Sequence, residues 1–124
     1  MKLYLNGVIV GEQTLAGDWS ELPDGENYLG RSQWRENDDF RGQLDDVRLW
    51  GVVRTEPQIR EGMHQKLTGN EPHLVALWNF DAGDARDVSP NRHHAQLMGN
   101  ANCVEAELPM ASELEHPSTA RQKF

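Results

Sequence analysis

"FRGQLDDVRLWGVVRTEPQI", residues 40–59, is the most strongly patterned stretch of the chain. Its first half, residues 41–50, is typical of a strand, but its apolar positions do not all fall on alternate residues. A bulge at Asp45 and Asp46 would bring the main apolar side chains onto one face. A strand buried on both faces near its end is the other explanation. The pattern therefore predicts a strand that ends near Trp50.

The second half of this stretch predicts a helix. Thr55 and Gln58 have the spacing of a capping box, and Pro57 falls in the first turn, where its missing N–H does no harm. Apolar residues then recur every four positions, at Ile59, Met63 and Leu67. We predict a helix over residues 55–68, capped by Gly69 and packed on a sheet through that apolar stripe.

Further strands are predicted on both sides of this unit. Asn6-Gly7 between apolar runs indicates a hairpin with strands near residues 2–5 and 8–13. In residues 72–81, apolar side chains fall on both faces of the predicted strand, as in a strand that is covered on both sides. Three shorter strands are expected at residues 27–32, 95–99 and 101–108. The set predicts an all-β, antiparallel two-sheet sandwich with one short helix.

Length and composition limit the possible functions. The 124 residues suffice for one domain, which we place at residues 1–108, with 109–124 as a disordered tail or linker. A net charge of −8 argues against nucleic acid as a partner. No apolar run approaches the ~18 residues of a membrane helix. The single cysteine, Cys103, cannot form a disulfide within the chain.

Four segments together resemble a known family. "LYLNG", "YLGRS", the stretch at residues 40–59 and "LVALWNFDAGDARDVSPNRHHAQLMG" come in the order found in laminin-G-like (LamG) domains. These domains are jelly rolls of the concanavalin A type, and the middle block also resembles pentraxins. The resemblance implies a jelly roll in an extracellular or cell-surface protein that binds glycans or proteins, often with calcium. Because a shared fold does not fix function, each residue must be considered separately.

The resemblance also implies that part of the domain is missing. LamG-like domains usually place much of one half before the "LYLNG" hairpin, whereas this sequence opens as if already inside a strand, without a signal-peptide core. A sandwich without those strands would leave open sheet edges, which pair readily with other chains. We therefore expect a partial domain that is marginally stable or self-associates.

The loop after "YLGRS" is the predicted ligand site. Trp34 stands among polar residues, and an aromatic ring beside hydroxyl-binding groups suits a sugar. We predict that the ligand contacts Trp34, Arg35, Asn37 and Asp38. The alternative is that Trp34 folds over the edge of the sheet. The positions that match the pentraxin calcium ligands, residues 31–34, lack carboxylates. The oxygen-bearing side chains of Asn37, Asp38 and Asp39 could replace them, or could form only a solvated acidic loop.

A second loop, "FDAGDARDVSPN", is the predicted metal site. Its oxygen-bearing side chains are those of Asp81, Asp84, Asp87 and Asn91. Calcium takes six to eight oxygen ligands, so a loop of this kind could supply most of a site. The alternative is that these residues only form Asx turns, which are common.

The sequence does not predict an enzyme. On a strand, Asp45 and Asp46 point to opposite faces, whereas the two carboxylates of a glucanase must reach the same sugar bond. The main hypothesis is therefore a non-catalytic module that binds carbohydrate or protein. The alternatives are a structural spacer or assembly domain without a ligand of its own, and a degenerate glucanase-like enzyme.

Overall fold

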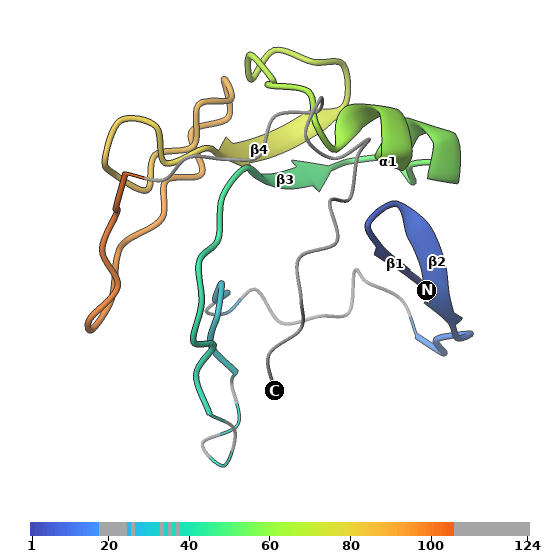
Figure 1. Ribbon diagram of the computed structural model, residues 1–124, viewed down its shortest axis with the longest axis horizontal. Helices are drawn as coiled ribbons and strands as arrows, with labels where there is room; N and C mark the ends of the chain where they lie inside the picture. The colour runs from blue at the N-terminus through green and yellow to red at the C-terminus, as the bar shows by residue number, and fades with distance from the viewer. Residues whose placement is uncertain (18–24, 26, 33, 35, 37, 106–124) are drawn as a thin grey trace, which may run out of the picture.

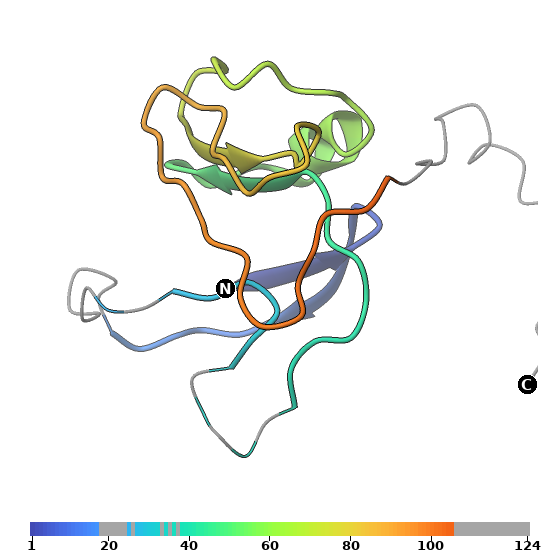
Figure 2. The same ribbon diagram turned by 90° about the vertical axis from the view of Figure 1, so that its left-hand side faces the viewer.

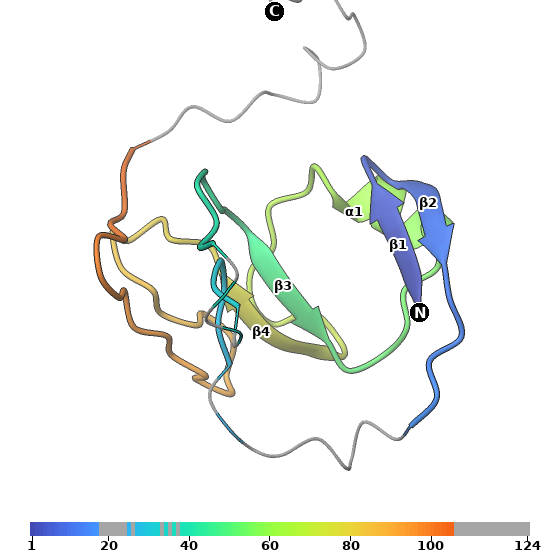
Figure 3. The same ribbon diagram turned by 90° about the horizontal axis from the view of Figure 1, so that it is seen from below.

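The computed structural model describes residues 1–17, 25, 27–32, 34, 36 and 38–105. These residues form two antiparallel strand pairs and one helix (Figure 1). The elements are β1 (Lys2–Leu5), β2 (Val8–Glu12), β3 (Val47–Trp50), α1 (Glu56–Gly62) and β4 (Leu74–Trp78). β1 pairs with β2, and β3 pairs with β4. Figure 3 shows the β1–β2 hairpin over α1, apart from the β3–β4 pair.

The predicted hairpin is confirmed. Asn6 and Gly7 have φ angles of 50° and 73°, as a two-residue type I′ turn requires. Gly7 also lies against the helix, because a Cβ there would approach the Met63 sulfur to 3.2 Å and the Arg60 Cα to 3.3 Å. Arg60 reaches back and donates a hydrogen bond to the Gly7 carbonyl at 3.4 Å. The turn therefore forms the hairpin and also joins it to α1.

β3 is shorter than the sequence predicted, and its bulge lies elsewhere. The strand begins at Val47, and Asp46 before it has a φ angle of 48°, outside the strand region. The register shifts between Leu49 and Trp50, so the bulge prediction at Asp45-Asp46 is wrong. Asp46 instead turns the chain into the strand, and the Oδ1 of Asp45 accepts its N–H at 2.8 Å.

The helix has the predicted start and a different end. Thr55 and Gln58 form both hydrogen bonds of the capping box, as predicted. α1 nevertheless ends at Gly62, about two turns before the predicted Gly69 cap. The Arg48 guanidinium of β3 donates to the Gly62 carbonyl at 2.6 Å and also to the Gln65 carbonyl. The Gly62 carbonyl, which could accept the next hydrogen bond of a longer helix, thus accepts one from a residue of β3.

The buried side chains gather around β4. Leu74, Ala76 and Leu77 are buried within the strand, which confirms the prediction that apolar residues are covered on both of its faces. Ala85, Asp87 and Ser89 in the following loop are buried as well. The core of the described part is therefore built on one strand and the loop that follows it.

A complete jelly roll is not seen among the described residues. The expected strands at 27–32 and 95–99 are irregular, and so are residues 101–105 of the third. A hydrogen bond from the Phe40 N–H to the Gly30 carbonyl closes a loop in place of a strand pairing. Residues 109–124, predicted to be a tail, lie outside the described part. Within that part, no helix is long and apolar enough to cross a membrane.

Candidate functional site

The loop that carries Trp34 is closed at its base. The Phe40 N–H donates to the Gly30 carbonyl at 2.7 Å, which brings the two ends of residues 31–39 together. At one end, Arg31 lies 5.1 Å from the centroid of the Tyr28 ring. Figure 2 shows that the chain leading into β3 extends away from the β3–β4 pair.

Trp34 is exposed on this loop, with 69% of its surface accessible. Its N–H donates to the Ser32 Oγ at 3.1 Å, so its backbone is anchored locally. The alternative of a ring folded over a sheet edge is inconsistent with such exposure. Of the other predicted ligand contacts, Asp38 is exposed, whereas Arg35 and Asn37 lie outside the described residues. The sugar site therefore stays a prediction, with its aromatic ring accessible.

The second loop covers the free edge of β4. The Leu77 N–H donates to the Asp87 Oδ1 at 2.9 Å, and the Val88 N–H donates to the Leu77 carbonyl at 2.9 Å. The Val75 carbonyl accepts from the Asn91 Nδ2 at 2.8 Å, and the Ser89 hydroxyl, whose oxygen lies 3.0 Å from this carbonyl, is shared between it and Asp87. We call Asp87, Val88, Ser89 and Asn91 the edge cap. It satisfies backbone groups that a further strand would otherwise pair.

Asp87 is the centre of the edge cap. Only 3% of its surface is exposed, and its two oxygens accept four hydrogen bonds. The donors are the N–H groups of Leu77, Ser89 and His93 and the Ser89 hydroxyl. Burial by itself would raise the pKa of Asp87, but these hydrogen bonds outweigh it and lower the pKa from the ordinary 3.8. The residue is therefore an ionised internal anchor.

The other predicted calcium ligands also have protein partners. Asp81 forms an ion pair with Lys66 at 2.7 Å, and Asp84 pairs with the Arg86 Nε at 2.7 Å. The hydrogen bond that Lys66 donates to Asp81 raises the pKa of Lys66, and the one that Arg86 donates to Asp84 lowers the pKa of Asp84. Asn91 is engaged in the edge cap.

The structure thus brings these four residues into one loop but turns them toward different partners. In the described part of the chain, no three His, Cys, Asp or Glu side chains are grouped as metal ligands. Calcium binding here stays a prediction, and it would require at least two of these contacts to be exchanged for the ion.

The two adjacent carboxylates near β3 have structural roles. Asp46 lies 3.5 Å from the Arg48 guanidinium, and Asp45 accepts the Asp46 N–H. Arg54 stacks 4.2 Å from the centroid of the Trp50 ring. Arg48 is the residue that connects β3 to the end of α1.

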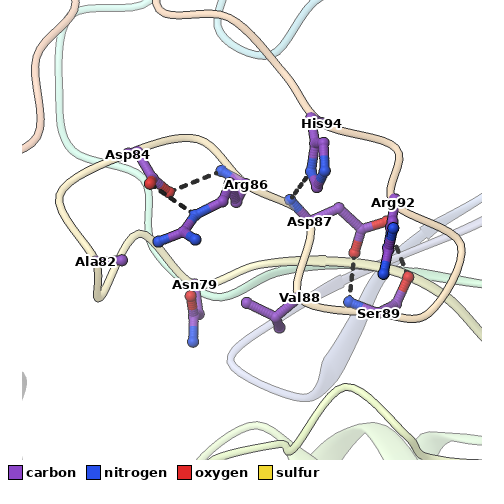
Figure 4. Close-up of a pocket in the computed structure, with 9 residues that line it drawn as sticks. All are labelled: Asn79, Ala82, Asp84, Arg86, Asp87, Val88, Ser89, Arg92 and His94. Carbon is purple, nitrogen blue, oxygen red and sulfur yellow. Dashed lines mark hydrogen bonds and ion pairs between the residues drawn. The ribbon is translucent and has the colours of Figure 1, made fainter.

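A polar hollow beside the edge cap was not predicted from the sequence. It has a volume of about 440 Å³, and Arg86, Arg92 and His94 contribute to its lining (Figure 4). The "DARD" segment, in which an arginine stands between two acids, was the available signal, since it indicates internal charge compensation. The acids of this loop were predicted to be calcium ligands, and its basic groups were part of no prediction.

The β1–β2 hairpin exposes much apolar surface. Its large exposed side chains are Leu3, Leu5, Val8, Ile9 and Val10. Among the described residues, neither edge of the hairpin pairs with a further strand. Such a surface is typical of an interface or of a sheet that another element covers.

Comparison with protein families gives one match. The family model Laminin_G_3, of the concanavalin A-like lectin/glucanases superfamily, matches residues 1–60. Comparison with curated proteins and with solved structures finds no match. The match contains the hairpin, the Trp34 loop and β3, and it confirms the resemblance to LamG-like domains for this stretch. The edge cap and the polar hollow lie beyond the matched residues.

Proposed function

We propose, on the premise that residues 1–60 form a LamG-like domain of the concanavalin A-like lectin/glucanase superfamily, that the chain is a non-catalytic carbohydrate-binding module. The sequence suggested either a glycan or a protein as the ligand, in an extracellular or cell-surface protein. Of these two ligands, we propose the glycan. The observation that carries the proposal is the exposed indole of Trp34 on a loop closed at its base.

The chemistry of this loop suits a sugar. An indole presents a flat apolar face that can lie against the C–H groups of a pyranose ring, while polar neighbours bind the hydroxyls. Exposing such a large ring to water is unfavourable, and a ligand that covers it recovers part of that free energy. Asp38, exposed on the same loop, can accept hydrogen bonds from hydroxyls.

The arrangement of the acids near β3 supports a role without catalysis. Retaining glycosidases place two carboxylates about 5 Å apart on either side of the bond that they cleave. Asp45 accepts a hydrogen bond from the next residue's backbone, and Asp46 is paired with Arg48. Both carboxylates are therefore engaged in local contacts at the start of a strand.

Glycan binding by Trp34 variants tests the proposal. A glycan array identifies a bound sugar, and calorimetry then measures its affinity for the wild type, Trp34→Ala and Trp34→Phe. Because truncating an aromatic residue at the centre of a binding site often costs about 2 kcal/mol, Trp34→Ala should lose at least about tenfold in affinity. Trp34→Phe should retain most of it. Val53→Ala, at an apolar residue that is 97% exposed outside the loop, is the matched control and should bind normally. Equal binding by Trp34→Ala and Val53→Ala would refute the proposal.

One observation favours a second candidate function, a structural spacer or assembly domain. The apolar surface and the open edges of the β1–β2 hairpin suit pairing with a second copy of the chain. In that case, the molar mass measured by light scattering should rise with concentration, and Val10→Lys should lower it. Val53→Lys is the control for the added charge. A concentration-independent monomer would argue against self-association.

A further inference from the structure

The polar hollow beside the edge cap has the dimensions of a ligand site. Its volume of about 440 Å³ lies within the ~300–1,000 Å³ typical of small-molecule pockets. The lining includes Asn79, Asp84, Arg86, Arg92 and His94. Figure 4 shows Arg86 and Arg92 on opposite sides of Val88. A single small ion would fill little of this space, so a sugar-sized ligand fits it better.

Two of the residues that line the hollow are anchored to the strand beside it. Asp87 and Ser89 are both 3% exposed, and each forms a hydrogen bond to β4. Because these groups are already satisfied, they position the surrounding side chains without competing for a ligand.

Two arginines and two aspartates line the hollow, so its formal charges balance, but the two arginines differ in their partners. The Asp87 carboxylate is turned toward backbone and hydroxyl donors, and the Asp84 carboxylate holds the Nε of Arg86. Arg92 donates its backbone N–H to the Ser89 carbonyl at 3.3 Å, but among the described residues its guanidinium has no ion pair. A ligand with an anionic group would supply the missing partner.

The other polar groups are mostly donors. The His94 Nδ1 accepts the Asp87 N–H at 3.2 Å, so the ring's own proton lies on Nε2 and can be donated. Arg86 uses Nε on Asp84, and a guanidinium has further N–H groups to offer. Asn79 gives its Nδ2 to Asp81 at 3.0 Å, which leaves its carbonyl oxygen as an acceptor for a hydroxyl.

We propose that this hollow binds an acidic sugar unit, with the Arg92 guanidinium on the anionic group and His94, Arg86 and Asn79 on neighbouring oxygens. A guanidinium binds a carboxylate or a sulfate through paired hydrogen bonds, which gives direction as well as charge. The assignment of the ligand as a sugar rests on the proposed function, whereas the anion preference rests on the hollow alone. The acidity of the whole chain disfavours long-range attraction, so binding depends on contacts within the hollow.

Nuclear magnetic resonance titration of the full chain tests the proposal. The probes are glucuronate, glucose 6-sulfate and neutral glucose at equal concentration and ionic strength. Glucuronate should shift the amide signals of residues 84–94, and glucose should not. Arg92→Gln should weaken this binding at least tenfold, and Arg92→Lys should weaken it less, since it keeps the charge. Arg41→Gln, at an exposed arginine outside the hollow, is the matched control and should bind as the wild type does.

The outcomes separate the two proposals. Binding of glucose 6-sulfate alone would support the site with a sulfate as its anion. Absence of shifts with both acidic sugars, or equal shifts with glucose, would overturn the acidic-sugar site whatever Trp34 does. Trp34→Ala should leave the titration of residues 84–94 unchanged. If acidic sugars bind at the hollow while glycan binding is insensitive to Trp34, only the Trp34 site is wrong.

Discussion

Replacing Asp87 with alanine should destabilise the protein strongly. The carboxylate is 3% exposed and accepts four hydrogen bonds from the edge cap, β4 and His93. Without it, the N–H groups of Leu77 and Ser89, in residues that are 0% and 3% exposed, lose their acceptor inside the protein. Each unpaired buried donor costs about 1–3 kcal/mol.

The other two donors, the Ser89 hydroxyl and the His93 N–H, should contribute less to the loss of stability. The Ser89 hydroxyl can turn to the Val75 carbonyl, which is already 3.0 Å away. His93 is exposed, so water can accept its N–H. The expected loss for Asp87→Ala is therefore about 4 kcal/mol, a large part of the ~5–15 kcal/mol that stabilises a typical domain. Asp87→Asn can keep its oxygen toward Leu77 and Ser89 and should lose about 1–2 kcal/mol.

Urea unfolding followed by tryptophan fluorescence measures these losses. With an m-value of about 2 kcal/mol per molar urea, Asp87→Ala should lower the midpoint by about 2 M, or leave the protein unfolded in water. Asp39→Ala removes the same carboxylate from an exposed position and should leave the midpoint near that of the wild type. If Asp87→Ala unfolds at the same urea concentration as Asp39→Ala, the assignment of Asp87 as an internal anchor is wrong.

Three further predictions concern pH, the helix end and calcium. Because the folded-state pKa of Asp87 is lowered, its stabilisation is full above the ordinary aspartate value of 3.8 and is lost as the pH falls below it. Acid unfolding of wild type and Asp87→Asn should therefore converge at low pH, and parallel curves would contradict this. Arg48→Ala should cost about 1–3 kcal/mol in urea unfolding, since it frees the Gly62 and Gln65 carbonyls; a loss no larger than that of Arg41→Ala would contradict the contact. If calcium exchanges for the present partners of the acids at residues 81–87, millimolar calcium should raise the melting temperature and a chelator should reverse the rise; an unchanged melting temperature would contradict the calcium prediction.

Local signals in the sequence predicted the local structure. The Asn6-Gly7 turn and the Thr55–Gln58 capping box depend on residues close together in the chain, and both form as expected. The end of α1 could not be predicted in the same way. It depends on Arg48, which lies fourteen residues before Gly62 in the chain and holds its carbonyl. The apolar stripe at Met63 and beyond indicated a longer helix, and a tertiary contact overrode it.

The acidic loop shows the same limit. Spacing alone suggested that Asp81, Asp84 and Asp87 could hold one ion, whereas the structure gives each a different partner. The Arg86 partner of Asp84 stands close to it in the sequence, but the Lys66 partner of Asp81 and the Leu77 N–H that Asp87 accepts have no sequence signature. From the sequence alone, an aspartate that binds a metal cannot be distinguished from one whose carboxylate accepts hydrogen bonds at the edge of a strand.

The position of the core has a consequence for how the protein folds. Every buried apolar side chain of the described part lies between Leu74 and Ala85, whereas the family match ends at residue 60. β3, α1, β4 and the edge cap are continuous in sequence, so their contacts close short loops and should form early. Hydrogen exchange should then be slowest in β4 and fastest in the β1–β2 hairpin. A chain cut after residue 60 would keep the stretch that matches the family model but lose β4 and the edge cap, where the buried side chains gather.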